Sequence, residues 1–146
     1  MLWGQEVLAR HASPDETLTL VVLRQTPPEG DPVLSLGFME FDWHVHPEFF
    51  FANERTPERV LLDIVDDVIN DRMILIYQRF ADGLMHPRIL DSLEFEVDFY
   101  QPGEEWTFRF WSGRVVDLDD LLDGRVRYKP LGGDALDGYV GPPRRA

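Results

Sequence analysis

Apolar and polar residues follow two repeats along this chain, one typical of strands and one typical of a helix. Strand side chains alternate between two faces, so apolar residues at every second position, or short β-branched apolar runs, indicate strands. Such patterns occupy five segments: 18–24, 33–45, 73–80, 93–100 and 106–111. Gln101-Pro102-Gly103-Glu104 is a turn signal between the last two segments. They are therefore expected to form a hairpin that places Arg109 opposite Glu96 and Phe108 opposite Val97.

The helical repeat begins at Thr56, which suits the N-cap position, with Pro57 at the first helical position and Glu58 in the first turn. The repeat continues to about residue 71. One broad arc of this helix is apolar, and it consists of Val60, Leu61, Leu62, Ile64, Val65, Val68 and Ile69. The opposite arc consists of Arg59, Asp63, Asp66, Asp67 and Asn70. This pattern predicts an amphipathic helix that packs on a sheet and presents an acidic stripe.

These elements predict an α+β fold, in which one main helix at about 57–71 packs on one face of a mostly antiparallel twisted sheet of about five to six strands. A short helix is expected over 117–123, closed by Gly124. The predicted domain covers residues 1–131, and a Gly/Pro-rich tail covers 132–146. The predicted core consists of Leu20, Val22, Leu36, Phe38, Leu61, Ile64, Val65, Val68, Ile74, Ile76, Phe95, Val97, Phe108 and Phe110. The pattern leaves open which face of the 33–45 strand is buried.

Composition narrows the class of partner. The 146 residues are 44% hydrophobic, which is enough for a core, and the formal net charge is -13. An acidic surface repels phosphate, so neither nucleic acid nor an anionic membrane is expected as a partner. There is no cysteine, which excludes disulfides and thiolate zinc ligands. No signal segment and no long apolar run is present, so we expect a cytoplasmic protein.

The stretch 40–48 carries the candidate chemistry. In an extended chain Glu40, Asp42, His44 and His46 share one face, and two imidazoles at this spacing can bind one zinc ion. His44-Val45-His46-Pro47 resembles the His-x-His-Pro element of the JAMM/MPN metalloproteases. That resemblance implies zinc bound by His44 and His46, with water as the nucleophile. The sequence departs from the family pattern downstream, where Glu54 and Pro57 replace the Ser and the Asp ligand.

A longer resemblance spans residues 33–113. The histidine element, the proline-started helix, an apolar strand and the hairpin that enters residues 107–113 are together similar to small bacterial α+β immunity proteins of toxin–immunity loci. This resemblance implies a cytoplasmic inhibitor that masks a cognate toxin domain and has no chemistry of its own. No residue role transfers position by position.

The preferred hypothesis is therefore a non-enzymatic acidic protein that binds a protein partner, such as a basic toxin domain, without a cofactor. The expected contact residues are Asp63, Asp66, Asp67, Asn70, Glu94, Glu96, Asp98 and Arg109. One alternative is a zinc-dependent hydrolase with His44 and His46 as ligands, Glu40 or Glu48 as general base, and His86 as a further imidazole. Another is a homodimer whose seam is formed by exposed Trp3, Trp111 and Tyr139.

Overall fold

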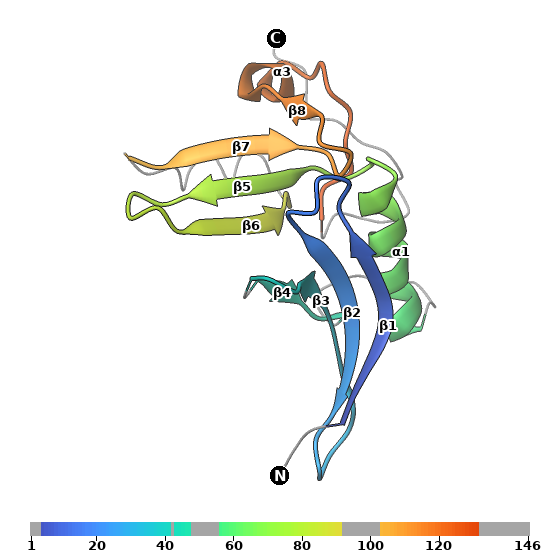
Figure 1. Cartoon of the computed structure of the whole chain (residues 1–146). Coiled ribbons are helices and arrows are strands. Elements are labelled where there is room, and N and C mark those ends of the chain that lie inside the picture. The colour runs from blue at the N-terminus through green and yellow to red at the C-terminus, as the bar shows by residue number, and fades with distance from the viewer. Residues whose placement is uncertain (1–3, 42, 48–55, 92–102, 132–146) are drawn as a thin grey trace. The chain divides into compact units, whose positions relative to one another are not determined.

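The computed structural model describes residues 4–41, 43–47, 56–91 and 103–131 (Figure 1). The chain divides into two compact units, Met1–Asp66 and Asp67–Ala146, and the boundary falls within the helix α1. In the part of each unit that the structure describes, there is one four-stranded antiparallel sheet. None of the helices in the described ranges is long and apolar enough to cross a membrane.

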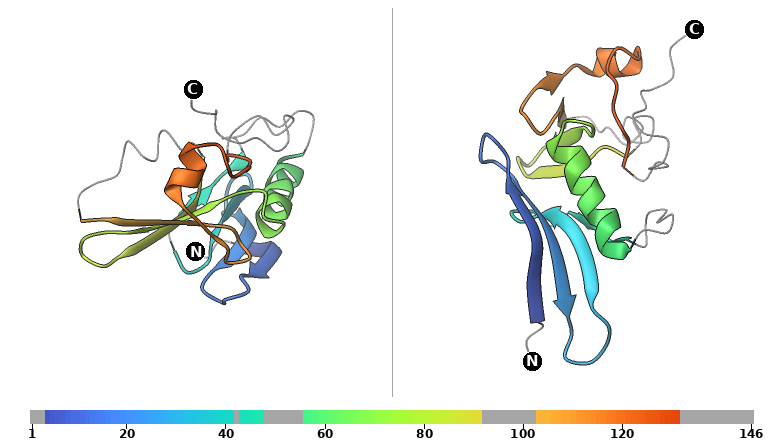
Figure 2. Two further views of the ribbon diagram at one scale, coloured as in Figure 1. Left: turned by 90° about the horizontal axis from the view of Figure 1, so that it is seen from above. Right: turned by 90° about the vertical axis from the view of Figure 1, so that its right-hand side faces the viewer.

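The sheet of the first unit has the order β1-β2-β3-β4, and Figure 2 shows its first three strands side by side. The strands are β1 (Gly4–Ala12), β2 (Thr19–Thr26), β3 (Val33–Phe38) and β4 (His44–Val45). Leu20 pairs with Phe38 and Val22 pairs with Leu36, so these four buried side chains share one face. The pairing confirms them as core residues and identifies the buried face of β3.

The helix α1 (Pro57–Ile69) begins where the sequence predicts, because the Thr56 hydroxyl accepts a hydrogen bond from the Arg59 amide at 3.1 Å. An ion pair between Arg24 of β2 and Glu58 joins the start of α1 to the first sheet. The apolar arc is buried at Leu61, Ile64, Val65 and Val68, as predicted. The helix ends two residues before the expected end, and Asp71 has a φ of 58°.

The second sheet has the order β6-β5-β7-β8. Its strands are β5 (Leu75–Arg79), β6 (Met85–Ile89), β7 (Glu105–Arg109) and β8 (Val115–Val116), and the short helix α3 (Leu118–Leu122) follows. Gly124, with a φ of 73°, follows α3 as predicted. One face of this sheet packs under α3 in a core that consists of Ile74, Ile76, Leu90, Phe108, Phe110, Val116, Leu121 and Tyr128.

The sheet arrangement corrects two sequence expectations. The described residues form two sheets of four strands, not one sheet of five or six. The predicted hairpin register is also wrong, because Phe108 and Arg109 pair with β5 on one side and with β8 on the other. Both sides of β7 are therefore paired at these two residues, and no side is left for the expected pairing with Glu96 and Val97. Glu96 and Val97 lie outside the described residues, as do the predicted core residue Phe95 and the tail 132–146.

A third correction concerns the histidine stretch. The segment 33–45 is not one strand, because β3 ends at Phe38 and the chain turns at residues 39–41 before β4 begins. The amide of Phe41 donates to the Phe38 carbonyl at 3.1 Å within this turn. Glu40 is therefore in a turn, and the four polar side chains do not form one continuous strand face. Asp42 lies outside the described residues.

Candidate functional site

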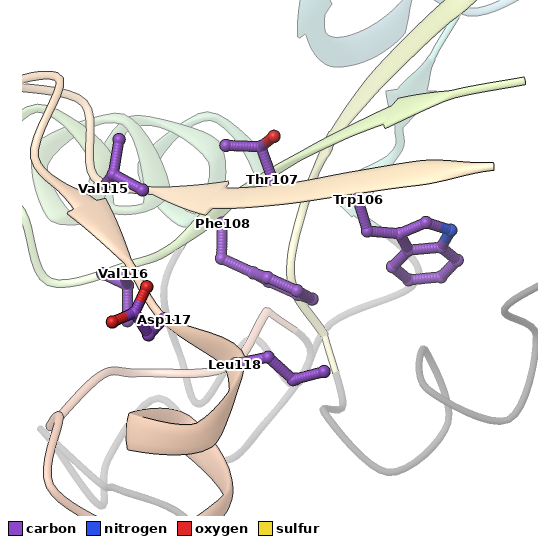
Figure 3. Close-up of a pocket in the computed structure, with 7 residues that line it drawn as sticks. All are labelled: Trp106, Thr107, Phe108, Val115, Val116, Asp117 and Leu118. Carbon is purple, nitrogen blue, oxygen red and sulfur yellow. The ribbon is translucent and has the colours of Figure 1, made fainter.

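A surface pocket of about 510 Å³ lies between β7 and the segment that joins β8 to α3 (Figure 3). The lining residues are Trp106, Thr107, Phe108, Val115, Val116, Asp117 and Leu118. Figure 3 shows the side chains of Trp106 and Phe108 on the side of β7 that faces Leu118, whereas Thr107 points the opposite way. All seven residues belong to the second unit.

The local fold explains why the pocket is apolar and open. A tight turn precedes β8, in which the Gly113 amide donates to the Phe110 carbonyl and the Phe110 amide donates to the Arg114 carbonyl, both at 2.9 Å. Strand alternation then buries Val116 and leaves Val115 63% exposed. Asp117 occupies the N-cap position of α3 without a capping hydrogen bond from its side chain. Leu118, which is 38% exposed, follows it at the pocket. Two large apolar side chains are thus held at the surface.

The indole of Trp106 is fixed from two sides. Its Nε1–H donates to Glu104 Oε2 at 3.1 Å, and the Arg88 guanidinium lies 5.0 Å from the ring centroid. Buried Gln78 links these two partners, since it accepts from Arg88 at 2.6 Å and donates to Glu104. A pinned indole loses little side-chain entropy on binding, which favours affinity at this wall of the pocket.

One carboxylate lines the pocket and others follow it in α3 and just after it. Asp117 lines the pocket, and Asp119 in the first turn of α3 is also exposed. Asp120 and Asp123 lie near Arg125, whose guanidinium nitrogens are 3.2 Å and 3.7 Å from their respective oxygens. The arrangement suits an incoming group that combines an apolar side chain with positive charge.

The histidine pair lies in the first unit. His44 is on β4, His46 follows it, and their ring centroids are 5.0 Å apart. His86 is on β6 in the second unit, where its ring packs against Phe80 with the centroids 6.1 Å apart. Among the described residues, no group of three or more His, Asp or Glu side chains could hold a metal ion. Glu48, the other candidate base, is outside those residues.

Glu40 has a structural role in the turn before β4. Its two carboxylate oxygens accept hydrogen bonds from the Thr19 amide at 2.8 Å and the Thr19 hydroxyl at 2.7 Å. Burial raises the pKa of Glu40, but the hydrogen bonds from Thr19 and the charge of Arg10 lower it, and the net pKa lies below the ordinary glutamate value. Glu40 therefore joins β2 to the turn in its ionised form.

Replacing Glu40 with glutamine should consequently destabilise the protein in a pH-dependent way. A carboxyl whose pKa is lowered in the folded state stabilises that state above the unfolded pKa, and this contribution is lost as the pH falls through the folded pKa. The difference in unfolding midpoint between the two proteins, measured in urea, should be largest near neutral pH and shrink in acid. A difference that is constant across this range would contradict the role assigned to Glu40.

The predicted contact residues separate into four groups. Asp66 and Asn70 are exposed and Asp63 is half-buried, with its carboxylate 2.8 Å from Arg59. Asp67 does not belong to the acidic surface, because it is 8% exposed and its Oδ2 lies 2.8 Å from Lys129 Nζ. Arg109 is half-buried, with its guanidinium 3.6 Å from the Tyr77 ring centroid. Glu94, Glu96 and Asp98 lie outside the described residues.

Trp111, one of the three aromatic residues predicted to form a homodimer interface, is buried and therefore does not belong to an exposed interface. Trp3 and Tyr139 lie outside the described residues. Sequence reasoning also missed the pocket itself. The available signal was the sequence Val115-Val116-Asp117-Leu118, in which apolar residues continue through the start of a short acidic helix.

Comparison of the chain with protein-family models, with curated proteins and with solved structures finds no match.

Proposed function

We propose that this chain is a non-enzymatic acidic binding protein of the immunity type, which neutralises a cognate basic toxin domain in the cytoplasm by direct contact. The observation that carries the proposal is the pocket of the second unit, whose lining includes exposed Val115 and Leu118, the pinned indole of Trp106 and the exposed carboxylate of Asp117. Contacts of this composition, with an aromatic anchor and an apolar floor inside a polar rim, are typical of protein–protein interfaces.

The two parts of the surface have different roles in binding. Burial of the apolar floor removes exposed hydrocarbon from water, which favours association. The carboxylates of Asp117 and Asp119 attract a basic partner and orient it, which chiefly raises the association rate. Increasing salt should therefore slow association more than it speeds dissociation.

The exposed carboxylates of α1 form a second proposed contact. Exposed Asp66 and half-buried Asp63 remain in α1 after Asp67 is assigned to a buried ion pair, and the exposed amide of Asn70 follows the end of the helix. Solvent-exposed charges of this kind contribute little affinity each, so they are expected to influence the association rate. The pocket should carry the larger share of the binding free energy.

Replacing both Val115 and Leu118 with serine should weaken binding of a basic toxin domain by about 10- to 100-fold, because two apolar contacts in an interface are together worth about 1.4–2.7 kcal/mol. The affinity can be measured by calorimetry with the purified domain. Leu84→Ser is a suitable control, since Leu84 is 65% exposed, close to the value for Val115, but lies in the β5–β6 turn away from the pocket. Equal affinity of the double variant and the control would refute the assigned surface.

A further inference from the structure

The first unit has a groove of about 540 Å³ over the outer face of its sheet, opposite to the face that carries the core residues of β2. Alternate residues of β2, namely Val21, Leu23 and Gln25, lie along its floor. Gln5 and Val7 of β1 are the cross-strand partners of Gln25 and Leu23 and extend the floor. Val21 is 5% exposed although it lies on the outer face, so the sheet is recessed at that point.

One wall of the groove is held by backbone contacts. Met39, Phe41 and Trp43 line this side, and all three belong to the segment between β3 and β4. The Met39 amide donates to the Thr19 carbonyl at 2.8 Å, which joins the segment to β2. A β-carbon on Gly37 would lie 2.5 Å from the Trp43 carbonyl oxygen, so the backbone lies directly against the floor there. A wall fixed in this way is largely pre-formed, as is usual for small-molecule sites.

The groove is lined by uncharged side chains. Among its described lining residues there is no Asp, Glu, Lys or Arg, whereas the chain as a whole is 28% charged. The lining includes the imidazoles of His44 and His46, and imidazole is ordinarily neutral above about pH 7. A charged ligand would lose hydration on entering this recess without meeting an opposite charge. The lining therefore favours a neutral ligand.

Polar groups and the length of the floor narrow the ligand further. Gln5 and Gln25 are a directly opposed pair, so their side-chain amides lie next to each other at one end, and Ser35 pairs with Leu23 in the adjacent row. An amide offers both donors and an acceptor, which suit a carbonyl or ring nitrogen. Gln25 is four residues from Val21 along β2, which spans roughly 13 Å. Two fused rings with a substituent at each end have about this length.

We propose that this groove binds a neutral, planar aromatic or heteroaromatic small molecule that has a hydrogen-bonding group at one end. The rings lie on the apolar floor against the aromatic wall, and the polar end meets the amides of Gln5 and Gln25. Apolar and aromatic lining with a few polar groups at fixed positions is the usual composition of such sites. The site lies in the first unit and does not depend on the pocket of the second unit.

Fluorescence titration of the full chain with prodan, a neutral naphthalene that carries a ketone at one end and a dimethylamino group at the other, tests this proposal. At about pH 8, where imidazole is ordinarily neutral, the emission should shift to the blue and saturate at one site. The expected dissociation constant is on the order of 10 µM. Anilinonaphthalene sulfonate, which is aromatic but anionic, should bind at least about tenfold more weakly. Equal affinity for the two dyes would overturn the proposal.

Val7→Asp places a carboxylate on the floor of the groove and should weaken prodan binding by at least about tenfold. Val33→Asp is the matched control, because Val33 is 37% exposed on β3 of the same sheet but does not line the groove. This variant should bind the dye as the unmodified chain does. Gln25→Ala should weaken binding by about three- to tenfold and shift the bound emission further to the blue, because the ketone loses a hydrogen bond.

The serine double variant at Val115 and Leu118 separates this groove from the pocket of the second unit. It should bind prodan normally, and Val7→Asp should leave toxin-domain affinity unchanged. Prodan binding that survives Val7→Asp but is lost in the serine variant would overturn the proposal, as would no saturable binding below about 100 µM. Circular dichroism of each variant excludes loss of folding as the cause.

Discussion

Replacing Asp67 with alanine should destabilise the second unit by about 3 kcal/mol. The carboxylate of Asp67 is 2.8 Å from Lys129 Nζ and 3.2 Å from Arg72 Nη1. The side chain of Lys129 is 14% exposed, so loss of its partner leaves an ammonium group with little access to water. Breaking a buried pair on one side costs more than the pair contributes, because the remaining charge is uncompensated.

The segment around Lys129 is also hydrogen-bonded to residues that are distant in sequence. The Lys129 amide donates to the Arg72 carbonyl at 2.6 Å, and the Leu131 amide donates to the Leu90 carbonyl at 2.9 Å. The ion pair therefore holds the end of the described chain beside the residues that follow α1. Its loss should release this segment, which buries Tyr128 against the core of the second sheet.

Asp63→Ala is the control for Asp67→Ala, since both residues lie in α1 and lose the same charge. Asp63 pairs with Arg59 at the surface, and such pairs contribute only a few tenths of a kcal/mol. Urea unfolding should show a large decrease in the free energy of unfolding for Asp67→Ala and a small one for Asp63→Ala. Equal losses would show that Asp67 acts merely as a surface charge. Lys129→Met in both backgrounds then isolates the coupling between Asp67 and Lys129.

Replacing Gly37 with alanine should destabilise the first unit by about 2 kcal/mol, in the range found for overpacked sites. A β-carbon at this position would lie 2.5 Å from the Trp43 carbonyl oxygen and 2.9 Å from the β-carbon of His44. The first of these is backbone, which cannot move without shifting β4 away from β3. The strand pair between Gly37 and His44 should therefore separate.

Gly4→Ala provides the comparison for this prediction. Gly4 also lies in a strand, at the start of β1, but an added β-carbon there would have no neighbour closer than 3.7 Å. The free energy of unfolding of the Gly4→Ala variant should change by less than about 0.5 kcal/mol. If Gly37→Ala were equally harmless, the close approach of β4 to β3 would not be a constraint on this sheet.

The helices could be predicted from the sequence because their signals are local. Thr56 and Pro57 mark the start of α1, and Gly124 marks the end of α3, within a few residues of the elements they cap. Buried strands with apolar runs, such as β2 and β5, were also found. The apolar runs of these strands reflect burial of their own side chains, so the sequence of the segment alone indicates the strand.

The edge strands β1 and β6 could not be predicted in the same way. Most residues of β1 are exposed, so it has no apolar alternation to detect. β6 contains Pro87, a residue that is unfavourable inside a sheet, but β6 is at the edge of its sheet, where a missing amide proton costs little. An edge strand forms because it pairs with a neighbouring strand, and the sequence of the edge segment alone does not show that pairing.

The candidate site depended on contacts between residues distant in sequence. Helical periodicity places Asp67 beside Asp63 and Asp66, but it does not show that Lys129, 62 residues later, reaches it. The pocket likewise requires β7 to lie beside β8, and the indole of Trp106 is held by residues from three strand regions, Gln78, Arg88 and Glu104. The sequence predicted Asp67 on an exposed acidic face, whereas the structure buries it in an ion pair with Lys129.

Hydrogen–deuterium exchange of the complex with a basic toxin domain tests the proposed binding role most directly. The account predicts that backbone amides of β7, β8 and the start of α3 exchange more slowly in the complex than in the free protein. Amides of the β5–β6 turn around Leu84 should be unchanged. Protection confined to other elements, with residues 105–108 and 115–118 exchanging as in the free chain, would contradict the assignment of this pocket as the partner-binding surface.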